Sequence, residues 1–199
     1  QTDQRYFFRP NFWPNTPDIN PWALQSSQES VYLQRYFLAA TLSSNTGVYG
    51  PVFEYLQGAA LPGKEEYLDS EKFQTRHWNW NAENKLTTLM GKINHLRKEH
   101  KALQQTNNIQ FLSIENDNLL AYYKYDEQQE SELICIVSLD PYYSQNGHVQ
   151  LPLAQLGIGA GHRIRVEDLI TQSSYHWDKE WNFVELHPVL PFHLFKIHK

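Results

Sequence analysis

The sequence predicts a mixed fold, in which the last βα units of a (β/α)8 TIM barrel are followed by an antiparallel β-sandwich. Residues 1–106 alternate strand-like and helical segments, whereas period-two strands at short spacing fill residues 107–199. The formal charge changes at the same point, from 11 basic and 10 acidic residues to 6 basic and 12 acidic residues. We therefore predict two domains, 1–106 and 107–199.

The first domain is expected to contain two helices. The segment ESVYLQRYFLAATL, ended by Asn45 and Gly47, is apolar on almost every side, which predicts a broadly buried helix. Residues 82–104 carry one apolar stripe, which predicts an amphipathic helix. GVYGPVFE, residues 47–54, is expected to form a short buried strand that Gly50 and Pro51 break. Parallel strands need neighbours and covering helices, so this piece is interpreted as the last quarter of a barrel.

The composition excludes several classes of function. The net charge is −5 with no block of like charges, so nucleic acid is not an expected partner. No apolar run approaches about 20 residues, so no segment is expected to span a membrane. The lone Cys135 cannot form an internal disulfide and suits a cytoplasmic protein. The nine histidines are scattered without ligand spacing, so neither a metal nor another cofactor is expected.

The stretch NFWPNTPD, residues 11–18, is the first candidate site. Asn15, Thr16 and Asp18 come directly after a predicted barrel strand, where barrel enzymes keep their catalytic groups. Pro14 and Pro17 each fix a φ angle, so the loop is expected to hold its carboxylate in one place. The same residues also fit a capped turn in which Asp18 binds backbone groups. Spacing alone leaves both interpretations open.

NFWPNTPDI resembles the fourth conserved region of the α-amylase superfamily, although it lacks the central His and has a Pro before the Asp. Together with SSNTGVYGPVFE and PGKEEYLDSEKFQTRHW, it closely resembles the maltosyltransferases that use maltose 1-phosphate to extend α-1,4-glucans. The likeness continues through VSLDP, VEDLI and NFVELHP, and so covers nearly all 199 residues. Because the chain starts without a methionine or a leader, we expect it to be cut from something longer.

The resemblance implies a retaining mechanism with an Asp nucleophile and a Glu general acid from earlier barrel strands. Neither has a candidate in this chain, so the fragment alone is expected to be inactive. Asp18 corresponds to the third carboxylate, which binds sugar hydroxyls and steadies the charged transition state. Asn15, Lys72 and Phe73 are expected to contact substrate, where Phe73 replaces a tyrosine of the family. Glu54 is expected to orient neighbouring groups.

The implied partners are maltose 1-phosphate, an α-1,4-glucan and the upstream part of the same barrel, and a homodimer is left open. Two alternatives remain at this stage. One is an α-glucan hydrolase or branching relative, which would differ in its acceptor. The other is a non-catalytic carbohydrate-binding β module with a helical extension. Trp177 and Trp181 would stack on glucan rings if they are exposed, or else pack in the sandwich or against the barrel.

Overall fold

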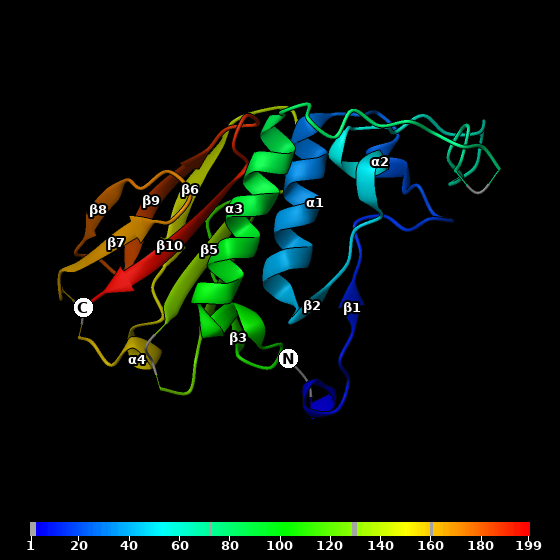
Figure 1. Cartoon of the computed structure of the whole chain (residues 1–199). Helices are drawn as coiled ribbons and strands as arrows, with labels where there is room; N and C mark the ends of the chain where they lie inside the picture. The colour runs from blue at the N-terminus through cyan, green and yellow to red at the C-terminus, as the bar shows by residue number, and fades with distance from the viewer. Residues whose placement is uncertain (1–2, 72, 129–130, 160) are drawn as a thin grey trace.

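The computed structural model describes residues 3–71, 73–128, 131–159 and 161–199 (Figure 1). Two long helices, α1 and α3, lie side by side against one face of a six-stranded sheet. The helices are η1 (Asp3–Tyr6), η2 (Trp22–Leu24), α1 (Glu29–Leu42), α2 (Gly50–Glu54), α3 (Lys85–Glu99), η3 (Lys101–Gln104) and α4 (Leu153–Leu156). The strands are β1 (Asn11–Phe12), β2 (Asn45–Thr46), β3 (Ile109–Leu112), β4 (Leu119–Tyr125), β5 (Glu132–Ser138), β6 (Gln145–Gln150), β7 (Ile164–Asp168), β8 (Ser174–Trp177), β9 (Trp181–Leu186) and β10 (Phe192–His198).

The large sheet has the order β3-β4-β5-β10-β7-β8, and every neighbouring pair in it is antiparallel. A second sheet, β6-β9, packs against its other face. The fully buried strand β5 shows how the two layers are held, because successive side chains of a strand point to opposite faces. Cys135 belongs to the core on the helix side, whereas Ile134 and Ile136 belong to the sandwich core. The predicted antiparallel β part is therefore present.

The two helices and the β part share one continuous hydrophobic core. Helix α1 is buried on almost every side, as its sequence predicts. Its Phe37 is fully buried and stacks on Phe192 of β10, with ring centroids 4.3 Å apart and an interplanar angle of 8°. Leu86 and Ile93 of α3 join the same cluster. Residues from both sides of the predicted boundary at 106/107 thus lie in one core.

Two cations from other elements meet the C-terminal end of α1, which has no basic residue in its own last turn. Arg97 of α3 donates to the carbonyl oxygens of Ala40, Ser43 and Ser44. The buried Lys124 of β4 donates to the Thr41 and Gln105 carbonyls, at 2.9 and 2.7 Å. Burial lowers the pKa of Lys124 to about 8. The orphan carbonyls and the negative end of the helix dipole are therefore satisfied across the core.

The predicted strand over residues 47–54 is wrong. Strand β2, which pairs in parallel with β1, ends at Thr46, just before this segment, and Gly50–Glu54 form helix α2. Pro51 lies in the first turn of α2, where its missing N–H costs no helical hydrogen bond. In the β part the sequence predicts six strands, at IQFLSI, LLAYYKYD, ELICIVSLD, HVQLPL, RIRVEDLI and PFHLFKIH, and strands β8 and β9 lie outside them. Trp177 of β8 is buried and packs edge-on against Phe195, so it is not available to stack on a sugar.

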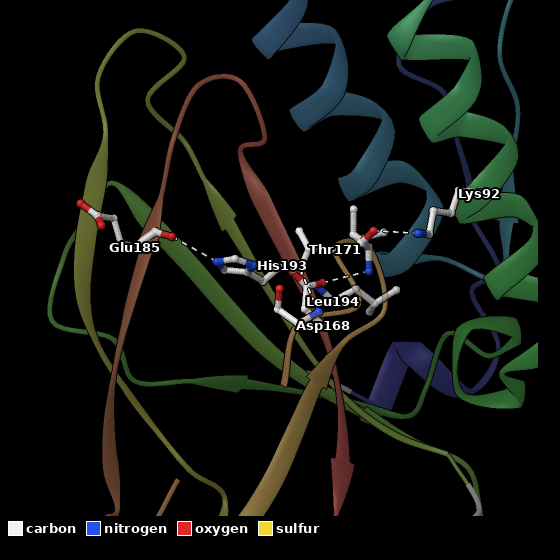
Figure 2. A network of polar contacts seen from close by, with 8 residues as sticks. Lys92, Asp168, Thr171, Glu185, His193 and Leu194 are labelled. Carbon is white, nitrogen blue, oxygen red and sulfur yellow. Dashed lines mark hydrogen bonds and ion pairs between the residues drawn. The ribbon is translucent and has the colours of Figure 1, made fainter. Parts of the chain in front are cut away.

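A buried polar network fixes the turn after β7 to β10 and to α3 (Figure 2). The fully buried Asp168 carboxylate accepts hydrogen bonds from His193 Nδ1 at 2.9 Å, the Thr171 hydroxyl at 2.9 Å and the Ile170 N–H at 3.0 Å. Lys92 Nζ donates to the Ile170 carbonyl at 2.7 Å. Burial by itself would raise the pKa of Asp168, but the bond and charge of His193 and the two other donors hold it below its usual value.

Replacing Phe37 with Ala removes one partner of the Phe37–Phe192 stack and leaves a cavity between the helices and the sheet. We expect a loss of about 3–5 kcal/mol in the free energy of unfolding. Because the core is shared, the helical and β signals should unfold in one transition at lower urea concentration. Phe183→Ala, at an exposed position of β9, should cost no more than about 1 kcal/mol. Separate transitions for the two parts would contradict the shared-core interpretation.

The lowered pKa of Asp168 predicts a specific loss of stability in acid. Since the folded pKa lies below the unfolded value of about 3.9, the carboxylate stabilises the fold above that pH, and its contribution disappears as the pH falls through the folded pKa. Asp168→Asn should lower the free energy of unfolding at pH 7 by about 1.5–3 kcal/mol. It should also reduce the further loss of stability that the wild type shows as the pH falls. Urea titrations between pH 7 and pH 3 measure both effects. The exposed Asp178→Asn serves as the control and should leave the profile unchanged.

Candidate functional site

Two loops meet at the end of the molecule where α1 and α3 begin (Figure 1). One is the segment 13–28 after β1, and the other is the segment 55–84 between α2 and α3. The buried Asn20 joins them, because its N–H donates to the Glu65 carbonyl and its Nδ2 to the Gly58 carbonyl, both at 2.9 Å. A Cβ at Gly58 would lie 2.2 Å from the Leu24 carbonyl oxygen, so only glycine allows this approach. The two loops therefore form one connected layer.

Asp18 lies at the tip of a tight turn. Thr16 and Ile19 exchange backbone hydrogen bonds of 3.1 and 3.3 Å, and the Thr16 hydroxyl also accepts the Ile19 N–H at 3.0 Å. Pro17 and Asp18 form the exposed tip between them. Pro17 favours this conformation because its ring fixes φ. The turn presents the Asp18 carboxylate outward on a backbone held by its own hydrogen bonds.

A hollow of about 470 Å³ opens beside this turn. It brings Asp18 together with Phe73, which is 82% exposed, so two of the predicted site residues share one cavity wall. Lys72 lies outside the described residues. The volume suits a small ligand, and carboxylates can accept hydrogen bonds from sugar hydroxyls. The residues lining the hollow are Pro17, Asp18, Leu61, Glu66, Tyr67, Leu68, Asp69, Ser70, Phe73 and Gln74.

Asn15 is buried beneath the loops, with 1% of its surface exposed, and does not line this hollow. Its Nδ2 donates to the Tyr49 carbonyl at 3.1 Å and to the Tyr67 hydroxyl at 2.8 Å, while its Oδ1 accepts the Tyr49 N–H at 3.0 Å. Both amide hydrogens and the amide oxygen are thus used within the protein. Through these hydrogen bonds, Asn15 links the Asp18 loop to the segment after β2.

Glu54 is the last residue of α2, and the structure does not bring it to the hollow. Its carbonyl oxygen accepts a hydrogen bond from Asn84 Nδ2 at 3.1 Å. Asn84 in turn caps α3, because its Oδ1 accepts the Thr87 N–H at 2.8 Å. Glu54 therefore lies at the junction of α2 and α3, and the orienting role predicted for its carboxylate remains a prediction.

The sequence interpretation missed an aromatic and acidic cluster in the long loop. Glu71 accepts the Tyr49 hydroxyl at 3.0 Å through Oε2 and the Trp78 Nε1–H at 2.9 Å through Oε1. Burial and the bond to Glu71 raise the pKa of Tyr49 to about 12. The Tyr67 ring lies 5.8 Å from that of Tyr49. The sequence signal for this cluster is the high density of aromatic residues between positions 49 and 80, because large aromatic side chains in a loop favour packing over solvation.

The described residues contain no group of three or more His, Cys, Asp or Glu side chains placed to hold a metal ion. Within the same part of the chain, none of the helices combines the length and apolar character needed to cross a bilayer.

Sequence comparisons match residues 111–197 to the family model described as "GLGE, C-terminal". The chain is 40% identical over 204 aligned residues to the α-1,4-glucan:maltose-1-phosphate maltosyltransferase of Chlorobaculum tepidum, covering 99% of this chain and 30% of that protein. It is 44% identical to the corresponding protein of Methylacidiphilum infernorum, covering 96% and 29%. The chain thus spans about 30% of the length of these curated relatives. These matches confirm the family resemblance drawn from the motifs.

Solved structures with a similar fold include α-amylases. An Anoxybacillus α-amylase matches with a TM-score of 0.63 and 12% identity, over 94% of this chain and 36% of that one. The maltogenic α-amylase AmyB of Thermotoga neapolitana matches with a TM-score of 0.60 and 12% identity, over 96% and 42%. At this level of identity the likeness concerns the fold alone.

Asn15→Ala tests whether the hydrogen bonds of Asn15 hold the loops together. The change leaves the Tyr49 N–H and carbonyl and the Tyr67 hydroxyl without their shared partner, so we expect a loss of about 1–3 kcal/mol in the free energy of unfolding. Backbone amides of the loops should also exchange faster with deuterium. The control is Asn81→Ala, at an exposed position of the same long loop, which should stay within about 0.5 kcal/mol of the wild type. Equal effects of the two substitutions would contradict the role of Asn15.

Proposed function

We propose that this chain, a homologue of the α-1,4-glucan:maltose-1-phosphate maltosyltransferases over nearly its whole length, forms part of an enzyme of that activity. The enzyme moves maltosyl units from maltose 1-phosphate to the non-reducing end of an α-1,4-glucan. The main support is sequence identity of 40% over 99% of the chain, which includes the loop that carries Asp18. The hollow beside Asp18 gives this activity a site of suitable size.

In this proposal β1 and β2 are neighbouring strands of a (β/α)8 barrel. Their parallel pairing, with α1 connecting them, supports this assignment, as does the Asp18 loop directly after β1. A second hollow, of about 680 Å³, opens beside β1 and α1 and is lined by Phe12, Trp13, Trp22 and Leu38. Trp13 and Trp22 are 46% and 58% exposed there. The preceding units of the barrel would cover this apolar surface, because parallel strands need neighbours on both sides.

Asp18 is the third carboxylate of the reaction. Its place at the tip of a hydrogen-bonded turn lets it bind sugar hydroxyls and stabilise positive charge as it develops at the reacting ring. The nucleophile and the general acid come from preceding strands, so two successive inversions retain the α configuration. Lys72 and Phe73 contact the donor sugar, with Phe73 supplying a ring face without a hydroxyl. Asn15 contributes by holding the Asp18 loop, and Glu54 by orienting groups near α2.

An α-glucan hydrolase or branching enzyme would use Asp18 in the same way, but the names of the relatives favour maltosyl transfer. A carbohydrate-binding β module with a helical extension is not favoured by the names of the relatives, and Trp177, one of its two candidate stacking residues, is buried. We place the enzyme in the cytoplasm, where the buried thiol of Cys135 stays reduced. A homodimer remains a prediction from the exposed edges and apolar surface of the chain.

The test is phosphate release from maltose 1-phosphate in the presence of glycogen. The full-length polypeptide that carries this chain should release phosphate, whereas the purified 199 residues should release none. Asp18→Asn in the full-length polypeptide should lower kcat/KM by about 10²–10³-fold while leaving the fold intact. Glu83→Gln, an exposed acid at the end of the same loop layer, is the matched control. Turnover by the 199 residues, or an undiminished Asp18→Asn enzyme, would contradict the proposal.

A further inference from the structure

The turn that carries Phe73 forms part of the wall of the Asp18 hollow. The Ser70 carbonyl accepts the Phe73 N–H at 2.9 Å and the Gln74 N–H at 3.1 Å, which closes the turn. Asp69 before it adopts a positive φ of 54°, a backbone conformation that is uncommon for residues other than glycine. Asp69, Ser70, Phe73 and Gln74 all line the hollow. The position of this turn therefore sets the shape of the cavity.

Glu71 lies within the turn, and its carboxylate is bound at both oxygens. Oε2 accepts the Tyr49 hydroxyl at 3.0 Å, and Oε1 accepts the Trp78 Nε1–H at 2.9 Å. Each donor is fixed to the body of the protein by a separate contact. The backbone of Tyr49 is hydrogen-bonded in both directions to Asn15, and the Trp78 ring stacks on Tyr55 with centroids 5.6 Å apart and an interplanar angle of 16°.

These contacts make a continuous link between the two walls of the hollow. It runs from Asn15, three residues before Asp18, through Tyr49 to Glu71 and into the turn that carries Phe73. We propose that Glu71 is a positioning residue, which holds the sugar-contacting turn at a fixed separation from Asp18. The inference rests on the proposed function for the identity of the ligand, and on the hydrogen bonds themselves for the link.

The carboxylate suits this role because it offers two acceptor oxygens to two donors at once. In Glu71→Gln the side-chain amide could still accept the Trp78 N–H, but its NH₂ group would face the Tyr49 hydroxyl, which would have to turn and become the acceptor. The methyl group left by Glu71→Ala reaches neither donor. Arg76, whose guanidinium carbon lies 4.8 Å from the Trp78 ring centroid, keeps a cation beside this cluster. We therefore expect the link to be strongest in the wild type, weaker in Glu71→Gln and absent in Glu71→Ala.

The first experiment measures kinetics in the full-length polypeptide. Glu71→Ala should lower kcat/KM for maltose 1-phosphate by about 10- to 100-fold, mainly through a higher KM, because the donor-contacting turn is misplaced. Glu71→Gln should recover part of this loss, and Tyr49→Phe, which removes one donor, should fall between the wild type and Glu71→Ala. Glu83→Gln is the matched control and should match the wild type.

The second experiment measures amide hydrogen exchange in the same full-length polypeptide without substrate, and so does not depend on activity. Exchange at the Phe73 and Gln74 amides should accelerate in Glu71→Ala and remain at the wild-type rate in Glu83→Gln. Unchanged exchange in Glu71→Ala would overturn the proposed link. Faster exchange combined with wild-type kinetics would make Glu71 merely structural and would equally overturn the positioning role. An inactive wild-type polypeptide would count against the proposed function, while the exchange result would still decide whether Glu71 holds the turn.

Discussion

The structure depends on the burial of α1, a helix that is apolar on nearly every side and so must be covered all round. The sheet covers one side through Phe192, and α3 covers a second side. The third side faces the β1–β2 pair and the open hollow lined by Trp13 and Trp22. This single requirement fixes the β part, the second helix and the two loops relative to one another. It also places the Asp18 turn, because the loop after β1 leads directly into the start of α1.

Much of this arrangement could be predicted from periodicity. The apolar stripe of α3 and the broad apolar surface of α1 identified both helices within a few residues of their observed ends. Residues 47–54 were misassigned because a short apolar run does not distinguish a strand from a buried helical turn, and Pro51 fits the start of a helix. Strand β8 was missed because Ser174, Tyr175 and His176 are exposed and give no apolar alternation. Its pairing with β7 decides its conformation instead.

The candidate site was predictable in part. The prolines and the acid of NFWPNTPD indicated a stiff loop that presents a carboxylate, and the turn at Thr16–Ile19 has this form. No local pattern could show that Asn15 turns inward while Asp18, three residues later, faces solvent. That difference arises from Tyr49 and Tyr67, which come from sequence positions 34 and 52 residues away. Long-range hydrogen bonds of this kind leave no periodic trace in a sequence.

The two cations at the end of α1 limit how such proteins can recombine. In a crossover between related genes at residue 106, Arg97 would come from the same parent as α1. The residue at position 124, where Lys124 binds the Thr41 carbonyl, would come from the other parent. A second parent with an apolar residue at that position would leave the helix end partly unsatisfied within a dry core. The boundary that composition makes most visible is therefore a poor place to join two parents, and inheritance of both parts as a block is the arrangement that this packing favours.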